Sequence, residues 1–150
     1  MRFIQSLRTF LISPEIIALL LPFALMPHAS FLDEISSMLA TKKYELFAAS
    51  VYPFAVLLYA LSQAGSVISP SGRRRVLIDW PGYPELKGTI YVSIALILTA
   101  FAVSIFGYVD FVIHGGRLGI VAIAAGGISS SVSAFTLTLA HWTTRELLGE

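Results

Sequence analysis

Long apolar stretches alternate with short polar segments along the chain, a pattern typical of helices that cross a bilayer. Three stretches would each form a helix of ~31–38 Å, enough for a hydrocarbon core of ~30 Å. They lie at 46–68, 89–109 and 118–142. A fourth at 14–27 covers only ~20 Å, so either the bilayer thins around it or residues before Ser13 extend it. We predict an all-α protein, one domain over 1–150 with four transmembrane helices.

Two shorter segments, 2–12 and 30–40, place apolar residues on one face of a helix and polar residues on the other. Such helices lie in the plane of a membrane interface, or they connect spans and pack on the bundle. Both interpretations fit the pattern. We predict amphipathic helices at the membrane interface.

Composition agrees with a membrane environment and narrows the chemistry. Hydrophobic residues make up 56% of the chain, charged residues 13%, and the mean hydropathy is +0.79. We therefore expect an integral membrane protein in contact with lipids. The chain contains no cysteine, which excludes disulfides and thiolate sites. The net charge of +1 gives no indication of nucleic-acid binding, and no catalytic or cofactor motif is present, so we expect neither an enzyme nor a cofactor.

The positive charges predict an orientation. If the chain crosses four times, seven of its ten Lys and Arg residues fall on one side. Lys42, Lys43 and Arg117 fall on the other. Because cytoplasmic segments carry the excess of positive charge, both termini and the loop 69–88 are predicted to be cytoplasmic. We expect the membrane to be a bacterial inner membrane.

The loop 69–88 holds three consecutive arginines followed by aromatic and proline residues, and its prolines and glycines argue against a continuous helix. One interpretation is a topology determinant with an aromatic anchor. The other is a docking site for an anionic headgroup or a cytoplasmic protein partner. The candidate contact residues are Arg73, Arg74, Arg75, Trp80 and Lys87.

The last stretch has small side chains at every fourth position, which lets another helix approach closely. This ladder comprises Ala122, Gly126, Ser130, Ala134 and Thr138, and a neighbouring row comprises Ala125, Ser129 and Ser133. The helix is either the packed centre of one bundle or a contact between copies that lines a path with hydroxyl groups. Because a chain of this size has little interior, we predict a homo-oligomer formed through this helix.

Glu15 is the acidic residue closest to the interior of a span. In the first turn after Ser13 and Pro14 it either complements the helix dipole near the interface or couples protons. The architecture resembles that of the small multidrug-resistance transporters, which combine four spans with a glutamate in the first helix. The segments 27–45 and 69–88 are longer than their loops and no motif around Glu15 matches, so no residue role is carried over.

These features support several functions. We expect a non-enzymatic, homo-oligomeric membrane subunit, channel-like or sensory, that engages a cytoplasmic partner through 69–88. Alternatives are a small proton-coupled transporter that uses Glu15, and an immunity or anti-phage defence protein, since small multi-span proteins without catalytic residues occur in such systems. His28 and His114 are expected on one side of the membrane but lack metal-ligand spacing, so no metal site is predicted.

Overall fold

The computed structural model describes residues 13–28, 30–68 and 79–148, and every regular element in these segments is a helix. In chain order they are α2 (Pro14–Leu25), the short 3-10 helix η1 (Met26–His28), α3 (Phe31–Leu39), α4 (Lys43–Ile68), α5 (Tyr83–His114) and α6 (Arg117–Leu148). The predicted all-α class is confirmed for these segments. The predicted helix at 2–12 lies outside the described residues.

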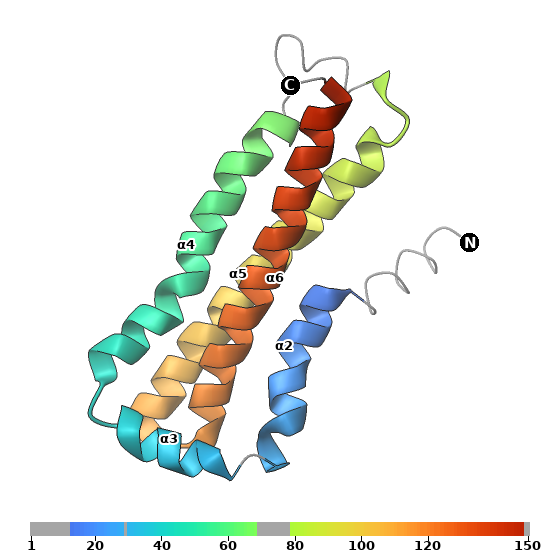
Figure 1. Cartoon of the computed structure of the whole chain (residues 1–150). Coiled ribbons are helices and arrows are strands. Elements are labelled where there is room, and N and C mark those ends of the chain that lie inside the picture. Colours follow the sequence, from blue (N-terminus) through green and yellow to red (C-terminus); the bar gives the residue numbers. More distant parts are fainter. Residues whose placement is uncertain (1–12, 29, 69–78, 149–150) are drawn as a thin grey trace.

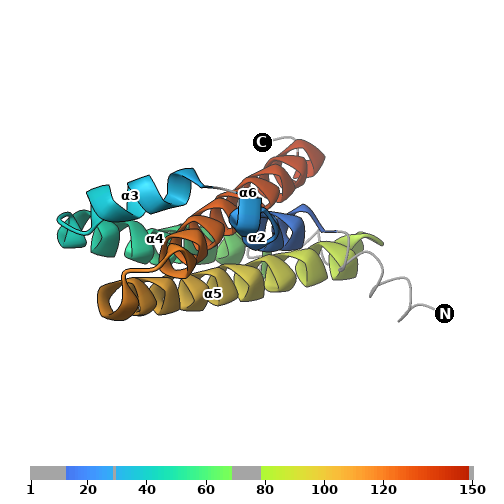
Figure 2. The same ribbon diagram turned by 90° about the horizontal axis from the view of Figure 1, so that it is seen from below.

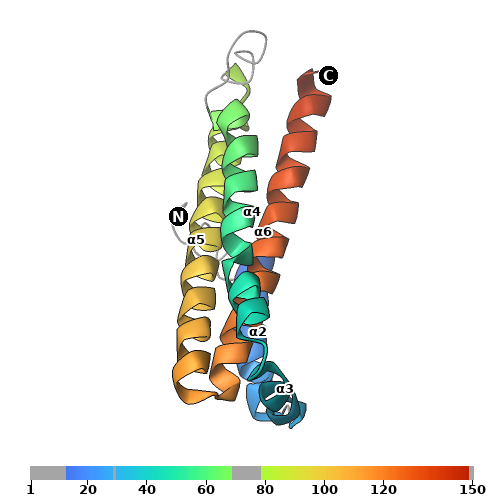
Figure 3. The same ribbon diagram turned by 90° about the vertical axis from the view of Figure 1, so that its left-hand side faces the viewer.

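Three helices are long and apolar enough to cross a membrane. The candidate spans are Lys43–Gly65, Tyr83–His114 and Arg117–Trp142. The long helices stand side by side, while α3 lies across one end of the bundle (Figures 1 and 3). α2 has 12 residues, or ~18 Å, and runs beside the half of α6 nearest α3 (Figure 1). A fourth span is therefore not established.

The start of α5 differs from the prediction. Residues 83–88 were expected in a loop but form the first turns of the helix. Pro84 explains the difference, because a proline in the first helical turn has no hydrogen bond to lose and a backbone already suited to the helix. At its other end α5 stops at Gly115, whose φ of 64° suits glycine, and α6 begins two residues later.

α5 and α6 pack backbone against backbone. A Cβ atom built on Gly107 would stand 2.6 Å from the Gly119 carbonyl oxygen, and one built on Gly119 would stand 2.6 Å from the Gly107 carbonyl oxygen. Such an approach is open only to glycine, and it is the packing expected where lipid supplies no hydrophobic drive between helices. α6 also packs against α4 and α2, so it is the central helix of the bundle, which Figure 2 shows from below.

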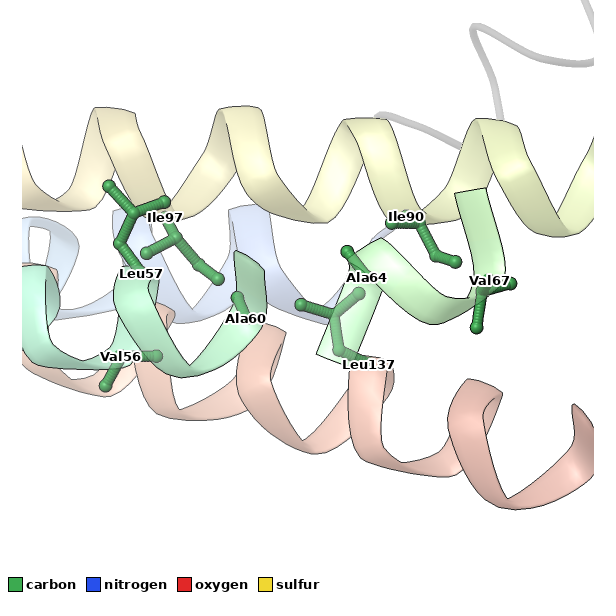
Figure 4. Close-up of a cluster of buried hydrophobic side chains, with 8 residues drawn as sticks. All are labelled: Val56, Leu57, Ala60, Ala64, Val67, Ile90, Ile97 and Leu137. Atoms are coloured by element: carbon green, nitrogen blue, oxygen red, sulfur yellow. The ribbon is translucent and has the colours of Figure 1, made fainter. Parts of the chain in front are cut away.

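Two apolar clusters complete the interior. The first joins α4, α5 and α6 and comprises Val56, Leu57, Ala60, Ala64, Val67, Ile90, Ile97 and Leu137 (Figure 4). The second lies near α3 and comprises Leu32, Leu46, Phe111, Ile120, Val121 and Ile123. Large apolar side chains also cover the outside, for example Leu20, Phe106 and Phe135, each more than half exposed. An apolar exterior of this kind is what hydrocarbon solvates.

Candidate functional site

The site is built on the first turn of α2. Ser13 caps the helix: its Oγ accepts a hydrogen bond of 3.4 Å from the N–H of Ile16. Pro14 occupies the start of the helix, where proline is favoured. Glu15 follows and is buried, with 5% of its surface exposed. The local sequence therefore starts a helix and places a carboxyl group in its first turn, against α6.

Glu15 lies at the middle of α6 along the bundle axis. The Oγ atom of Ser129 donates a 3.0 Å hydrogen bond to the backbone carbonyl of Glu15, and Oγ1 of Thr136 donates a 2.7 Å bond to its Oε1. Each of these partners is 12 residues from the nearer end of α6, or ~18 Å along the helix. The candidate span itself ends at Trp142, six residues or ~9 Å beyond Thr136, so the carboxyl group lies inside the span and nearer its C-terminal end.

Thr136 has two acceptors for one hydroxyl proton. Its Oγ1 is 2.7 Å from Glu15 Oε1 and 3.2 Å from the Val132 carbonyl oxygen of its own helix. When Glu15 is ionised, Thr136 donates to the carboxylate. When Glu15 is protonated, its O–H donates to Thr136, which donates to Val132 instead. The same geometry therefore satisfies both protonation states of the carboxyl group.

Ser133 completes the site. The spacing of four and three residues puts it on the same side of α6 as Ser129 and Thr136. Its side chain is fully buried, and its Oγ has no hydrogen-bond partner among the described residues. We call Glu15, Ser129, Ser133 and Thr136 the Glu15 cluster. A buried hydroxyl without a partner costs free energy, so this oxygen is available to a ligand.

No positive side chain among the described residues lies near the middle of the bundle. Their lysines and arginines are Lys42, Lys43, Lys87, Arg117 and Arg145, all close to helix ends. No ion pair within the described segments includes Glu15. In a medium of low dielectric a carboxylate without a counter-charge is costly, and a bound proton or cation removes that cost.

The small residues of the ladder contact other helices of the same chain. Ala122 and Ser130 are buried, and a Cβ atom built on Gly126 would stand 2.5 Å from the Ala100 carbonyl oxygen of α5. Ala134 packs against the first apolar cluster, and the Thr138 hydroxyl lies 3.2 Å from the hydroxyl of Tyr59 on α4. These contacts fit the first interpretation, the packed centre of one bundle. The predicted contact between copies stays a prediction.

The candidate contact residues of the loop are only partly described. Arg73, Arg74 and Arg75 lie outside the described residues. The Trp80 ring packs on Gly82, where an added Cβ would stand 2.6 Å from the indole, and the Lys87 ammonium group lies 5.8 Å from the centre of the Tyr91 ring. These two residues therefore stabilise the start of α5, and their role in docking stays a prediction.

The sequence did not predict a cluster at the α3 end. Arg117 forms a bidentate ion pair with Asp33, and Ser36 Oγ donates a 2.8 Å hydrogen bond to the Gly115 carbonyl oxygen, so α3 is tied to the start of α6. The hydrogen bond from Arg117 holds the pKa of Asp33 below its ordinary value. His114 Nδ1 lies 3.0 Å from Asp110 Oδ1. In the described segments no three His, Asp or Glu side chains gather where they would hold a metal.

Thr136 was not predicted as the partner of Glu15. The row of serines that includes Ser129 and Ser133 was the feature of the sequence that could have indicated a polar partner for Glu15, because it forms a polar face on an otherwise apolar helix. The register between α2 and α6 decides which hydroxyl meets the carboxylate, and no local pattern encodes that register.

Three apolar, membrane-length helices joined in one bundle with an apolar exterior indicate a helical membrane protein. Comparison with known protein families, with curated proteins and with solved structures finds no match to this chain.

Proposed function

We propose that the protein is a small integral membrane transporter in which Glu15 takes up and releases a proton inside the helix bundle. The observation that supports this most directly is the burial of the Glu15 carboxyl group at the middle of α6, bonded to Thr136. Charged groups inside a membrane are costly and are retained where they serve a function. A purely structural helix start would be served as well by an acid at the interface, where water solvates it.

The hydrogen bonds around Glu15 support proton exchange rather than a fixed charge. Thr136 can donate to the ionised carboxylate, or accept from the protonated acid while it donates to Val132. Neither state leaves the threonine hydroxyl without a partner, so the two states differ little in hydrogen bonding. α2 adds a second feature, since a short helix that starts midway through the bundle resembles the broken helices that form transporter sites.

The orientation is part of the same proposal. If α2 and the residues before it complete a fourth crossing, the excess of Lys and Arg on one side favours both termini and the loop after α4 in the cytoplasm, in a bacterial inner membrane. The Glu15 carboxyl group then lies inside the hydrocarbon layer on its cytoplasmic side, and α3 lies at the outer interface. We propose no catalytic activity for this site.

A homo-oligomeric channel-like or sensory subunit is the second candidate. One observation favours it: the pairs Tyr52–Ser131 and Tyr59–Thr138 link α4 to α6 through hydroxyls that are exposed on the outside of the bundle. Polar groups on an outer face within the candidate spans suit a contact between copies. Native mass spectrometry in nanodiscs tests it. Discrete oligomers that Ser131→Leu disrupts would support this candidate, and a strict monomer would exclude it.

The transporter proposal is tested by proton flux. Purified protein is reconstituted in liposomes that contain a pH-sensitive dye, with a pH gradient across the membrane. Sodium, lithium, potassium and tetraphenylphosphonium chlorides are then added one at a time. We expect at least one cation to dissipate the gradient with wild-type protein, and Glu15→Gln to abolish the response.

Glu15→Asp is the matched control, because it keeps the carboxyl group and should retain part of the flux. Circular dichroism of each variant verifies the helical fold. Absence of proton movement with every cation, or an unchanged response in Glu15→Gln, would overturn the proposal.

A further inference from the structure

We infer that the Glu15 cluster binds a small monovalent alkali cation, sodium or lithium, in place of the proton. This inference rests on the proposed function and names the ion that the site exchanges for the proton. Four features of the cluster carry it: the type of its donor atoms, the unpartnered Ser133, the single negative charge and the close packing of the helices.

Every atom of the cluster that could bind a cation is an oxygen atom. These atoms are the two carboxylate oxygens of Glu15, its backbone carbonyl oxygen, and the hydroxyls of Ser129, Ser133 and Thr136. Oxygen ligands of this kind suit hard cations, whereas transition metals prefer nitrogen and sulfur.

Ser133 provides the independent indication of a ligand. Its hydroxyl is fully buried on α6, between the Glu15 partners Ser129 and Thr136 in sequence, yet it has no partner among the described residues. Ser130 makes a useful comparison, since it is equally buried three residues away but donates a 2.9 Å hydrogen bond to the Gly127 carbonyl oxygen. A cation held between Ser133 and Glu15 would satisfy the free oxygen, and a proton on Glu15 alone would not.

The charge of the site selects a monovalent ion. Glu15 is the one acid that the described residues bring to the middle of α6, so a monovalent cation gives a neutral complex and a divalent cation leaves a net charge of +1. Within hydrocarbon an uncompensated charge is strongly disfavoured, so the neutral complex is the more stable one.

Close packing favours the smaller ions. The hydrogen bonds from Ser129 and Thr136, of 3.0 Å and 2.7 Å, hold Glu15 directly against α6. A large cation therefore fits between them only if α2 moves away from α6. We therefore expect sodium and lithium to bind more tightly than potassium.

Binding must be exclusive, because the proton and the cation use the same carboxylate oxygens. The balanced step is simple: the protonated Glu15 releases one proton to water as the cation binds the carboxylate, and the reverse step restores the acid. No bond other than O–H breaks. One cation crossing in one direction then returns one proton in the other, which is a cation–proton exchange.

The test is a calorimetric titration of the full chain in lipid nanodiscs with lithium or sodium chloride, with choline chloride as the ionic-strength control. Repeating it in buffers of different ionisation enthalpy measures the protons released. We expect about one proton per cation, and an affinity that falls about tenfold for each pH unit in the range where Glu15 is protonated. Ser133→Ala should weaken binding roughly tenfold or more, as expected for losing one ligand to a charge.

Ser130→Ala is the matched control and should leave binding unchanged. Equal affinities for wild type, Ser130→Ala and Ser133→Ala would remove Ser133 from the site. Absence of binding heat and of proton release with both ions would overturn the inference. If tetraphenylphosphonium alone drives Glu15-dependent proton flux in liposomes, the cation inference fails while the transporter proposal stands. Absence of any Glu15-dependent proton movement would overturn both the cation inference and the transporter proposal.

Discussion

Two neighbouring glycines on α6 should respond in opposite ways to one added methyl group. At Gly126 the new Cβ would stand 2.5 Å from the Ala100 carbonyl oxygen and 2.9 Å from Ser104 Cβ, which belong to α5. At Gly127 it would meet nothing within 4 Å. Both residues lie within the same helix, so the intrinsic gain from replacing glycine by alanine is the same for each.

The magnitudes follow from two opposing terms. Gly→Ala inside a helix stabilises by ~0.5–1 kcal/mol, and Gly127→Ala should keep that gain. Overpacking of a close contact costs ~1–3 kcal/mol, because the carbonyl oxygen belongs to a rigid backbone that cannot move alone. Gly126→Ala should therefore be destabilised by ~0.5–2 kcal/mol after the same gain is subtracted.

Equilibrium unfolding measures the difference. Protein in dodecyl maltoside micelles is titrated with sodium dodecyl sulfate and followed by circular dichroism, and the free energies of unfolding of the two variants are compared with wild type. We expect the variants to lie on opposite sides of wild type, ~1–3 kcal/mol apart. Equal stabilities, or a Gly126→Ala variant more stable than wild type, would refute the backbone contact between α5 and α6.

Three further predictions concern hydrogen bonds. Thr136→Val should slow Glu15-dependent proton flux severalfold in the liposome assay while Thr136→Ser retains it; equal rates would separate the hydroxyl from the mechanism. Arg117 holds the pKa of Asp33 below its ordinary 3.8, so the ion pair stabilises α3 at neutral pH and is lost when acid protonates Asp33. Hydrogen exchange of the α3 amides, scaled to intrinsic rates, should therefore become faster in acid for the wild type. Asp33→Asn should give fast exchange at every pH. Tyr59→Phe should cost about 0.6 kcal/mol in the same unfolding titration, and the 92% exposed Tyr44 supplies a control, Tyr44→Phe, that should cost nothing.

The helices were largely predictable because lipid imposes strong rules on sequence. Three apolar stretches became the three candidate spans, and the ladder that includes Gly126 but omits Gly127 marked a face of α6 that another helix approaches closely. The start of α5 was misjudged because Pro84 was treated as a helix breaker, although proline in the first turn favours a helix. α2 is shorter than a membrane span, so its length does not determine its depth in the bilayer, which depends on how it packs against α6.

The candidate site was predictable only in part. Glu15 stood out because an acid beside an apolar stretch is rare, and the serine row on the last helix marked a polar face. The pairing of Glu15 with Thr136, and of Asp33 with Arg117, joins residues more than 80 positions apart. Such contacts depend on helix register and on the angle at which helices meet, and the periodicity within one helix contains no information about either.

Infrared spectroscopy of Glu15 tests the central claim most directly. Protein in lipid nanodiscs is titrated with pH, and the carboxylic C=O stretching band is followed in wild type, Glu15→Gln and Thr136→Val. We predict a band that disappears as the pH rises, that is missing in Glu15→Gln, and that shifts in frequency in Thr136→Val because one hydrogen bond is lost. A spectrum with no pH-dependent carboxyl band assignable to Glu15 would show that this residue does not exchange a proton within the bundle.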